Sequence, residues 1–290
     1  MMSEAEVSEY AIGPTAWCPG CGNFGIITAL KKALEAMGKK PHEVLLVGGI
    51  GQAAKLPHYL SGNVLNGLHG RTLPNATGAK IANGELTVIV TTGDGCTYGE
   101  GGNHLMHAIR RNIDITCIVH NNQVYGLTKG QASPTSDFGF VTRLQPHGVI
   151  LSRFNALALV LAMGGTFAAR SFSGDQEHLS RMIQEAVRHK GFSLLEVLQP
   201  CVSFNRVNTF AWYKERIYDV NQQPGYDTGA ITAAFEKSLE WGQKIPVGVI
   251  YRTEKPTFTD HIPVLGPGPL VGRPALEKEV LSSLIEEFIP

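Results

Sequence analysis

Short apolar runs alternate with amphipathic segments along the first 200 residues of the chain, and this alternation constrains the fold more than any other feature. Each run has the length of a buried strand, and each amphipathic segment has the length of a covering helix. The order is typical of an α/β fold in which a parallel sheet carries helices on both faces. The expected strands are "EVLLVGGIG" (43–51), "ELTVIVTTGDG" (85–95), "DITCIVHNN" (114–122) and "FSLLEVLQP" (192–200), and the expected helices span 23–38, 101–112 and 173–191.

The pattern changes after residue 200, where aromatic residues, Pro and Gly become more frequent. Helices are expected at 228–241 and 274–288, with the loop "LGPGPLVGRP" leading into the second. We therefore expect an α/β domain over residues 1–200 and a loop-rich C-terminal extension over 201–290. The extension is expected to pack on that domain and on partner subunits.

Composition excludes several classes of function. Lys plus Arg equals Asp plus Glu, 25 against 25, so the chain lacks the basic excess that nucleic acids or anionic membranes attract. No apolar run is long enough to span a bilayer, and the polar start "MMSEAEVSEY" is typical of neither a signal nor a transit peptide. Five cysteines, an odd number, favour metal or redox use over a disulfide framework. We expect a cytoplasmic protein.

A glycine-rich turn follows the second expected strand. Gly93, Asp94 and Gly95 lie at the carboxyl end of that strand, where open parallel sheets bind ligands. Glycine lets a backbone approach an anion closely, and the helix that follows presents its N-terminal amides to phosphate. Taken alone, "GDG" is equally compatible with an ordinary turn between a strand and a helix.

The end of the third expected strand supplies a partner for this turn. Asn121 and Asn122 end that strand, and Asn122 lies 28 positions after Asp94, about the length of one strand end, helix and strand. Neighbouring parallel strands would bring the two side chains to one sheet edge. A carboxylate, an amide oxygen and a main-chain carbonyl are ligands that suit Mg²⁺ bound to phosphate.

This pairing of "GDG" with "NN" resembles the diphosphate-binding motif of thiamine diphosphate enzymes. The resemblance implies that Asp94, Asn122 and the main chain of Val124 hold Mg²⁺ against the diphosphate. The turn would then cradle the diphosphate, and its acid would bind the metal.

Further stretches narrow the resemblance. "WCPGCGNFGI" (17–26), "GGIGQAAKLPHY" (48–59), "NNQVYGLTKGQASPTS" (121–136) and "LQPCVSFNRVNTFAWYKERIY" (198–218) are similar to the beta subunit of 2-oxoacid:ferredoxin oxidoreductases. The resemblance implies reversible oxidative decarboxylation of a 2-oxoacid, with coenzyme A taking the acyl group and ferredoxin taking the electrons. The substrate is left between 2-oxoglutarate and pyruvate.

The cysteines agree with part of this resemblance. Cys18 and Cys21 form a Cys-x-x-Cys turn that is able to direct two thiolates to one centre, although a zinc turn or a redox dithiol has the same spacing. The resemblance implies a 4Fe–4S cluster on Cys18, Cys21 and Cys201. The fourth cysteine of the family would occupy position 52, where this chain has Gln52 instead. The last ligand could be Gln52, another side chain, solvent or a partner. A three-iron or labile cluster is the alternative. Cys96 is an unproven substitute for the missing cysteine.

Loops at the same sheet edge carry the expected substrate contacts. Lys55 and Lys129 are candidates to attract a substrate carboxylate, Leu127 to form a pocket wall, and His69, in preference to His58, to contact the thiamine. A solvated lysine and a structural histidine are the ordinary alternatives. The residues expected at the cofactor are Gly22, Ile50, Gly51, Lys55, His69, Gly93, Asp94, Gly95, Cys96, Asn122, Val124, Gly126, Leu127 and Thr128.

The resemblance also implies an obligate partner. Thiamine catalysis needs an acid on the aminopyrimidine ring, and in this family another half-site supplies it. We therefore expect an alpha subunit, separate or fused to a gamma part. The rival readings are a subunit of a non-redox thiamine decarboxylase, which needs no iron, and a non-catalytic scaffold subunit.

Overall fold

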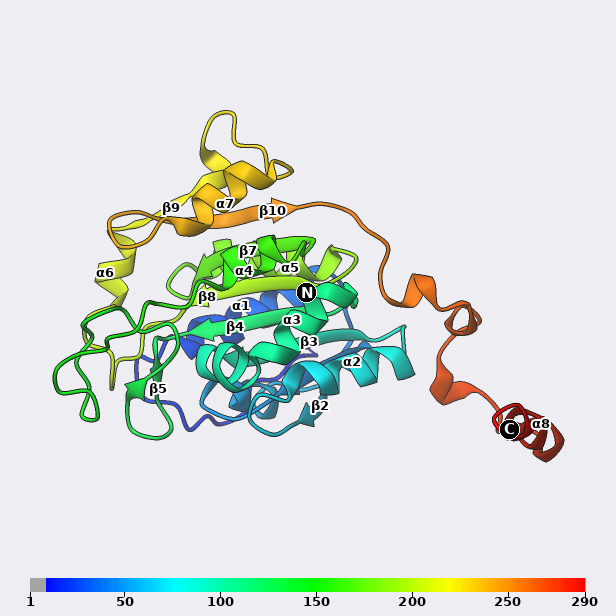
Figure 1. Ribbon diagram of the computed structural model, residues 1–290. Helices are drawn as coiled ribbons and strands as arrows, with labels where there is room; N and C mark the ends of the chain where they lie inside the picture. Colours follow the sequence, from blue (N-terminus) through cyan, green and yellow to red (C-terminus); the bar gives the residue numbers. More distant parts are fainter. Residues whose placement is uncertain (1–8, 290) are drawn as a thin grey trace, which may run out of the picture.

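A single sheet of eight strands forms the centre of the molecule (Figure 1). The computed structural model describes residues 9–289, so most of the polar N-terminal stretch noted above lies outside the described residues. The strands are β1 (Val44–Gly48), β2 (Asn63–Asn66), β3 (Thr87–Gly93), β4 (Thr116–Asn121), β7 (Phe167–Phe172), β8 (Ser193–Leu198), β9 (Ile217–Asp219) and β10 (Ile245–Arg252). Their order is β2-β1-β3-β4-β8-β7-β10-β9.

The strands from β2 to β7 in this order are parallel, as the alternating sequence pattern predicts. At the edge of the sheet beyond β7 the strand direction changes: β10 runs antiparallel to β7, and β9 runs parallel to β10. Both of these strands come from the C-terminal part, for which only helices and loops were expected. The apolar run "IPVGVIY" was the available signal for β10.

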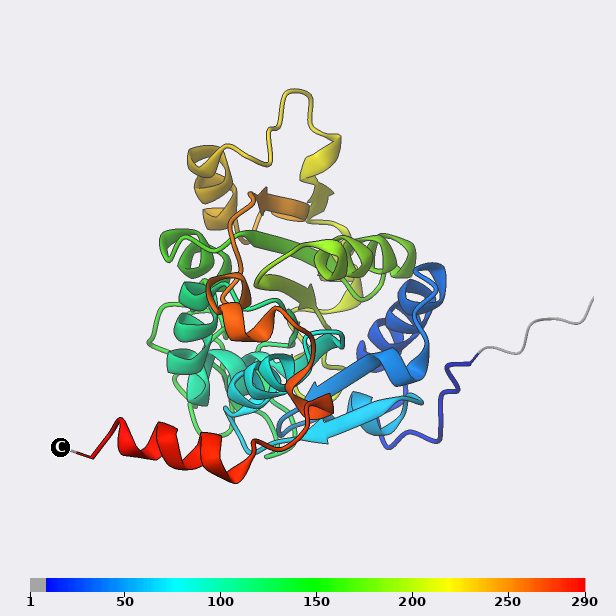
Figure 2. The ribbon, with the colours of Figure 1, turned by 90° about the vertical axis from the view of Figure 1, so that its right-hand side faces the viewer.

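Helices cover both faces of the sheet (Figures 1 and 2). Neighbouring residues of a strand point to opposite faces, and Leu46 and Val47 of β1 accordingly enter two different apolar cores. Leu46 packs with α1 and α5, whereas Val47 packs with α2, α3 and α4. The helices are α1 (Asn23–Ala36), α2 (Thr72–Ala82), α3 (Gly102–Arg111), α4 (Ala156–Ala162), α5 (Gln176–Arg188), α6 (Phe210–Lys214), α7 (Ile231–Leu239) and α8 (Lys278–Glu286).

Local chemistry sets where these helices begin. The Asp175 side chain accepts a hydrogen bond from His178 N at 3.0 Å and caps α5, and Asn155 caps α4 in the same way. The start of α1 is set by packing instead. A Cβ on Gly25 would lie 2.0 Å from the Ser173 carbonyl oxygen, so only glycine allows α1 to approach the end of β7 this closely.

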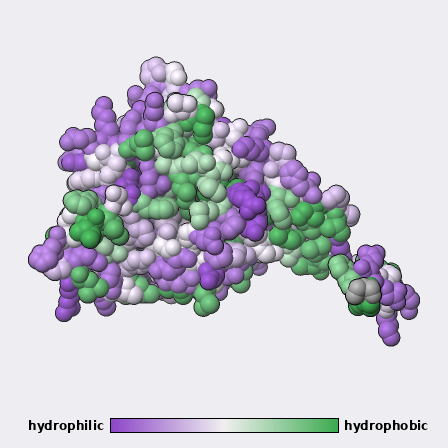
Figure 3. Space-filling model, viewed as in Figure 1, coloured by the Kyte–Doolittle hydropathy of each residue, from purple (hydrophilic) through white to green (hydrophobic). Residues whose placement is uncertain are grey.

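The C-terminal segment leaves the body of the molecule after β10 (Figures 1 and 2). Apolar residues gather on its surface (Figure 3), among them Val264 and Val271, which are 63% and 69% exposed. The segment ends in α8, which projects from the rest of the chain. Within residues 9–289, no helix combines the length and the apolar character required to cross a membrane.

Candidate active site

Asp94 and Asn122 follow two adjacent strands at the carboxyl edge of the sheet. Asp94 comes directly after β3, Asn122 comes directly after β4, and Gly93 pairs with His120 across the two strands. The sheet therefore delivers a carboxylate and an amide to neighbouring positions, as the spacing predicted. This edge is where open α/β sheets bind ligands.

Hydroxyl groups hold the Asp94 carboxylate. Asp94 is buried, and its Oδ2 accepts hydrogen bonds from Ser133 Oγ at 2.6 Å and from Thr135 Oγ1 at 2.5 Å. Burial raises the pKa of Asp94 to about 6, and the two hydroxyls oppose that rise. The carboxylate thus has a fixed orientation before any metal is bound.

The two asparagines have different surroundings. Asn121 is fully buried, donates from Nδ2 to Glu196 Oε1 at 3.0 Å and meets Thr135 Oγ1 through Oδ1 at 2.8 Å. Asn122 is half-buried, and its Oδ1 accepts only the local bond from Val124 N at 3.0 Å within the described chain. Asn121 is therefore built into the interior, whereas Asn122 remains the asparagine able to face a ligand.

The glycine turn continues as a short π-helix, η3 (Gly95–Glu100), beneath a hairpin of β5 (Val124–Tyr125) and β6 (Gln131–Ala132). A Cβ on Gly95 would lie 2.2 Å from the Tyr125 ring, so the hairpin packs directly on the turn. The Tyr125 hydroxyl donates to Glu100 at 3.3 Å. The hairpin therefore orders both the turn and the main chain of Val124.

A loop after β2 adds His69 and contacts Cys96. His69 Nδ1 lies 3.2 Å from Glu100 Oε2, although without the angle of a hydrogen bond. Cys96 is buried, and its Sγ accepts from Gly70 N at 3.2 Å. The Cys96 thiol therefore joins this loop to the glycine turn.

The predicted lysines lie on two loops at this edge. Lys55 belongs to the 3₁₀ helix η2 (Ala53–His58). This helix lies next to the glycine turn, since a Cβ built on Gly93 would lie 3.9 Å from Ala53 Cβ. Lys129 lies at the tip of the β5–β6 hairpin, beside Leu127, which is 45% exposed. Within residues 9–289, neither lysine forms an ion pair. The remaining predicted residues of these loops are Ile50, Gly51, Gly126 and Thr128; Ile50 is 38% exposed, and Gly51 has a φ of 104°.

The cysteines of two distant loops come together. Cys18 Sγ accepts from Ser203 Oγ at 3.1 Å, and Cys21 Sγ accepts from Gln199 Nε2 at 3.5 Å, so the loop that carries both thiols packs against the loop that carries Cys201. Gly22 N also donates to the Pro200 carbonyl at 3.3 Å.

Electrostatics agree with this proximity. Burial raises the pKa of Cys21 to about 11, and the neighbouring Cys201 and Cys18 thiols contribute to the rise. In the described part of the chain, no three His, Cys, Asp or Glu side chains converge as ligands of a single metal ion. A cubane cluster is wider than one ion, so its thiolates lie farther apart than the ligands of a mononuclear site.

Sequence reasoning did not single out Ser133 and Thr135, which hold Asp94. Both lie in "ASPTS", which was quoted only as part of a longer motif. Arg170 and Glu196 were missed as well, and their charges inside the apolar strands "TFAARSF" and "SLLEVL" were the available signal.

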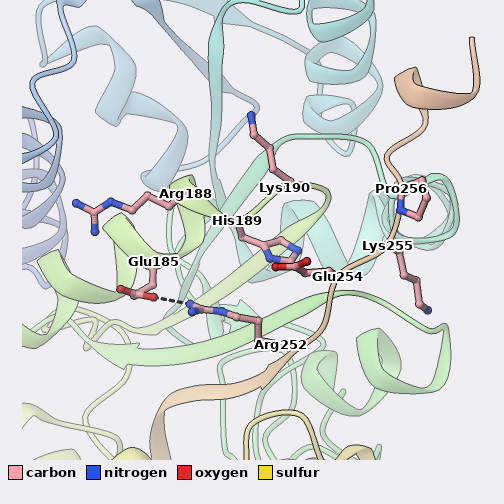
Figure 4. A pocket seen from close by; sticks show the side chains of 8 residues that line it. All are labelled: Glu185, Arg188, His189, Lys190, Arg252, Glu254, Lys255 and Pro256. Carbon is pink, nitrogen blue, oxygen red and sulfur yellow. Dashed lines mark hydrogen bonds and ion pairs between the residues drawn. The ribbon is translucent and has the colours of Figure 1, made fainter. Parts of the chain in front are cut away.

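A separate pocket of about 610 Å³ lies near the opposite edge of the sheet, where β8 begins (Figure 4). The end of α5 and the chain after β10 line it, and Arg252 Nη2 donates to Glu185 Oε2 across it at 2.5 Å. None of the predicted site residues contributes to this pocket.

Comparisons with known proteins match this arrangement. Residues 48–197 match the family described as thiamine pyrophosphate enzyme, C-terminal TPP binding domain, and residues 201–266 match the family of the C-terminal part of the pyruvate ferredoxin oxidoreductase beta subunit. The chain is 43% identical over 271 residues to the 2-oxoacid:ferredoxin oxidoreductase subunit beta of Saccharolobus solfataricus, covering 89% of each chain. It is 35% identical over 250 residues to the 2-oxoglutarate synthase subunit KorB of Methanocaldococcus jannaschii, covering 86% of this chain and 92% of that one.

A solved structure of a 2-oxoacid oxidoreductase is also similar to this chain. The 2-oxoglutarate:ferredoxin oxidoreductase from Magnetococcus marinus, with 2-oxoglutarate, coenzyme A and succinyl-CoA bound, is similar to this chain with a TM-score of 0.88 and 30% identity. The match covers 98% of this chain and 97% of that one.

Proposed function

Because the chain belongs to the family of 2-oxoacid:ferredoxin oxidoreductase beta subunits, we propose that it binds thiamine diphosphate and Mg²⁺ at the Asp94 edge of its sheet. The enzyme decarboxylates a 2-oxoacid oxidatively, forms an acyl-CoA and passes electrons to ferredoxin. The positions of Asp94 and Asn122, directly after two adjacent parallel strands, carry the proposal.

The residues present fit the cofactor. Asp94 offers a carboxylate, Asn122 an amide oxygen and Val124 a main-chain carbonyl, which are hard oxygen ligands of the kind that Mg²⁺ prefers. Gly93 directly precedes the acid, and a Cβ there would meet only Ala53 Cβ at 3.9 Å, so a phosphate could approach the main chain at this position. When bound, thiamine diphosphate supplies the nucleophilic carbon and the electron sink for decarboxylation.

Substrate recognition is proposed for the loops around this site. Lys55 and Lys129, which lack ion pairs within residues 9–289, would bind carboxylates of the 2-oxoacid. A second cation would favour a dicarboxylic substrate such as 2-oxoglutarate over pyruvate. Leu127 would form an apolar wall, and His69 would present a polar contact oriented by Glu100.

The electron path is proposed to begin at the cysteine cluster. Cys18, Cys21 and Cys201 would hold a 4Fe–4S cluster, because the loops that carry them pack together through the contacts of Ser203 and Gln199. All five cysteines are free thiols, so Cys18, Cys21 and Cys201 are available as cluster ligands. An alpha subunit would complete the active site with the acid that faces the aminopyrimidine ring.

Purified complex of this chain with its alpha subunit tests the function. Coenzyme A-dependent reduction of a viologen dye should occur with 2-oxoglutarate or pyruvate, and the chain alone should not turn over. Asp94→Asn should weaken Mg²⁺ and thiamine diphosphate binding more than tenfold in calorimetry, whereas Asp227→Asn, on a loop of the C-terminal part, should not.

The same material separates the rival functions. Decarboxylation without dye reduction, and without iron or sulfide, would indicate a non-redox decarboxylase. Unchanged cofactor affinity in Asp94→Asn would indicate a scaffold subunit.

A further inference from the structure

Three loops, not two, meet at the cysteines. Trp17 Nε1 donates to the Gln52 carbonyl oxygen at 2.9 Å, and Trp17 directly precedes Cys18. The loop after β1 is thereby fixed beside the loop that carries Cys18 and Cys21, which itself packs against the loop of Cys201. Gln52 is the residue of that loop that the Trp17 contact holds in place.

The side chain of Gln52 has an unusual environment. Its Oε1 atom is buried and has no hydrogen-bond partner within the described residues. Leaving an amide oxygen buried without a partner costs free energy on the order of 1–3 kcal/mol. The Gln52 oxygen is therefore available to a ligand that enters the site.

Gln199 is the other buried amide next to the thiols whose oxygen lacks a partner within residues 9–289. Its nitrogen already faces the sulfur, because Nε2 donates to Cys21 Sγ at 3.5 Å and to the Pro200 carbonyl at 3.0 Å. The Gln199 amide is thus committed as a donor to a thiolate. Both oxygens lack a partner within residues 9–289, but only Gln52 lies at the position where the family resemblance implies the missing thiolate.

From this geometry we propose that Gln52 Oε1 is the ligand or immediate neighbour of the one iron that lacks a thiolate, in the cluster assigned to this chain above. The inference rests on the proposed function, which supplies the cluster. A carboxamide oxygen is a harder, weaker and uncharged ligand compared with a thiolate, which suits iron–sulfur centres best. One iron of the four is therefore removable, and the cluster interconverts between four-iron and three-iron forms.

The conversion balances in atoms and charge. The cubane releases one ferrous ion and gives one electron to an added oxidant such as ferricyanide, and a cluster of three irons and four sulfides stays on the three thiolates. Adding ferrous ion with a reductant reverses the step.

The test uses the complex with the alpha subunit, purified without oxygen, and follows iron content and electron paramagnetic resonance. One equivalent of ferricyanide should release one iron per cluster from the wild type and produce the signal of an oxidised three-iron cluster. Gln52→Cys should retain four irons under the same treatment and show a lower reduction potential. Gln52→Ala should lose one iron per cluster to the same ferricyanide faster than the wild type does.

Gln243→Ala, at an exposed position of the C-terminal part, is the matched control, because it removes a glutamine side chain and leaves the cysteine loops and Gln52 unchanged. The cluster of this variant should convert between its four-iron and three-iron forms as the wild-type cluster does. A cluster that resists ferricyanide in the wild type, or behaves alike in wild type, Gln52→Cys and Gln52→Ala, would overturn the inference alone. Absence of iron and sulfide from every protein would overturn the ferredoxin-dependent function together with the inference.

Discussion

Arg170 Nε donates to Glu196 Oε2 at 2.7 Å from directly paired positions of β7 and β8. Both side chains are at most 1% exposed, so this ion pair lies inside the sheet. Burial would raise the pKa of Glu196, but Arg170 and Arg153 hold it below its ordinary value. Glu196 Oε1 also accepts from Asn121, the residue before the proposed metal ligand Asn122.

Removing one partner should be costly. Glu196→Gln leaves the Arg170 charge buried without compensation, so we expect the free energy of unfolding to fall by about 3–5 kcal/mol. The midpoint of urea unfolding measures the change. Adding Arg170→Met to Glu196→Gln should cost less than the sum of the single substitutions, because the two groups interact.

The control is an ion pair of similar length on the surface. Lys32 Nζ lies 2.6 Å from Glu177 Oε1, with side chains 45% and 73% exposed. Lys32→Met should change stability by about 0–1 kcal/mol. An equal loss at both sites would contradict the role given to burial.

Thr135 should matter for metal binding without touching the metal. Thr135→Val keeps the shape of the side chain but removes the hydroxyl that orients Asp94. We expect the affinity for Mg²⁺ and thiamine diphosphate to fall about 10–100-fold, the range found for outer ligands of metal sites. Titration calorimetry provides the measurement. Thr142→Val, which removes a buried hydroxyl bonded to Gln145 in the same segment, should bind as the wild type does.

His120 should make the protein sensitive to acid. It is fully buried in β4, and burial lowers its pKa from 6.5 to about 3. The unfolded chain takes up a proton at this residue below pH 6.5 and the folded chain does not, so stability falls as the pH drops from about 6.5 towards 3. Between pH 7 and pH 5 the contribution is about 2 kcal/mol.

His120→Gln retains a donor for Asn23 Oδ1, which lies 2.8 Å from His120 Nδ1, and should flatten this part of the pH profile of urea unfolding. His261→Gln, at an exposed position, should leave the slope as it is. An unchanged slope in His120→Gln would assign the acid sensitivity to other groups.

Substitution of Lys55 or Lys129 should affect kcat/KM differently for 2-oxoglutarate and for pyruvate. If one of them binds the distal carboxylate of a dicarboxylic acid, replacing it with Met should lower kcat/KM for 2-oxoglutarate by about 10–100-fold and spare pyruvate, because a charge-assisted hydrogen bond is lost. Lys55→Met and Lys129→Met are compared in the complex with the alpha subunit. Lys244→Met, on an exposed loop of the C-terminal part, serves as the control. Equal effects on both substrates would place the lysine at the shared carboxylate.

The sequence allowed most of the parallel part of the sheet to be predicted, because β1, β3, β4 and β8 are apolar runs, whereas the short, exposed β2 was not predicted. The sequence also allowed us to predict that Asp94 and Asn122 lie at one edge of the sheet, since this prediction needs only the order and direction of the strands. Ser133 and Thr135 could not be assigned to Asp94, because the contact depends on how the β5–β6 hairpin folds back over the turn. The antiparallel β10 was missed because its apolar run lies outside the alternating part of the chain.

The position of the Gln52 main chain next to the Cys18 loop likewise depends on one contact, the bond from the Trp17 side chain. Sequence similarity marked Gln52 as a departure from the family. Only the fold showed that its amide oxygen is buried without a partner within the described residues.

The reversed direction of β10 has a practical consequence. This strand begins at the edge that carries Asp94 and ends at the other edge, where β7 starts, and the chain after Arg252 departs from there. A fluorophore attached to Ser283 in α8 would therefore stand well away from the cofactor. A change in its signal on adding the alpha subunit would test the expectation that the C-terminal part packs on partner subunits.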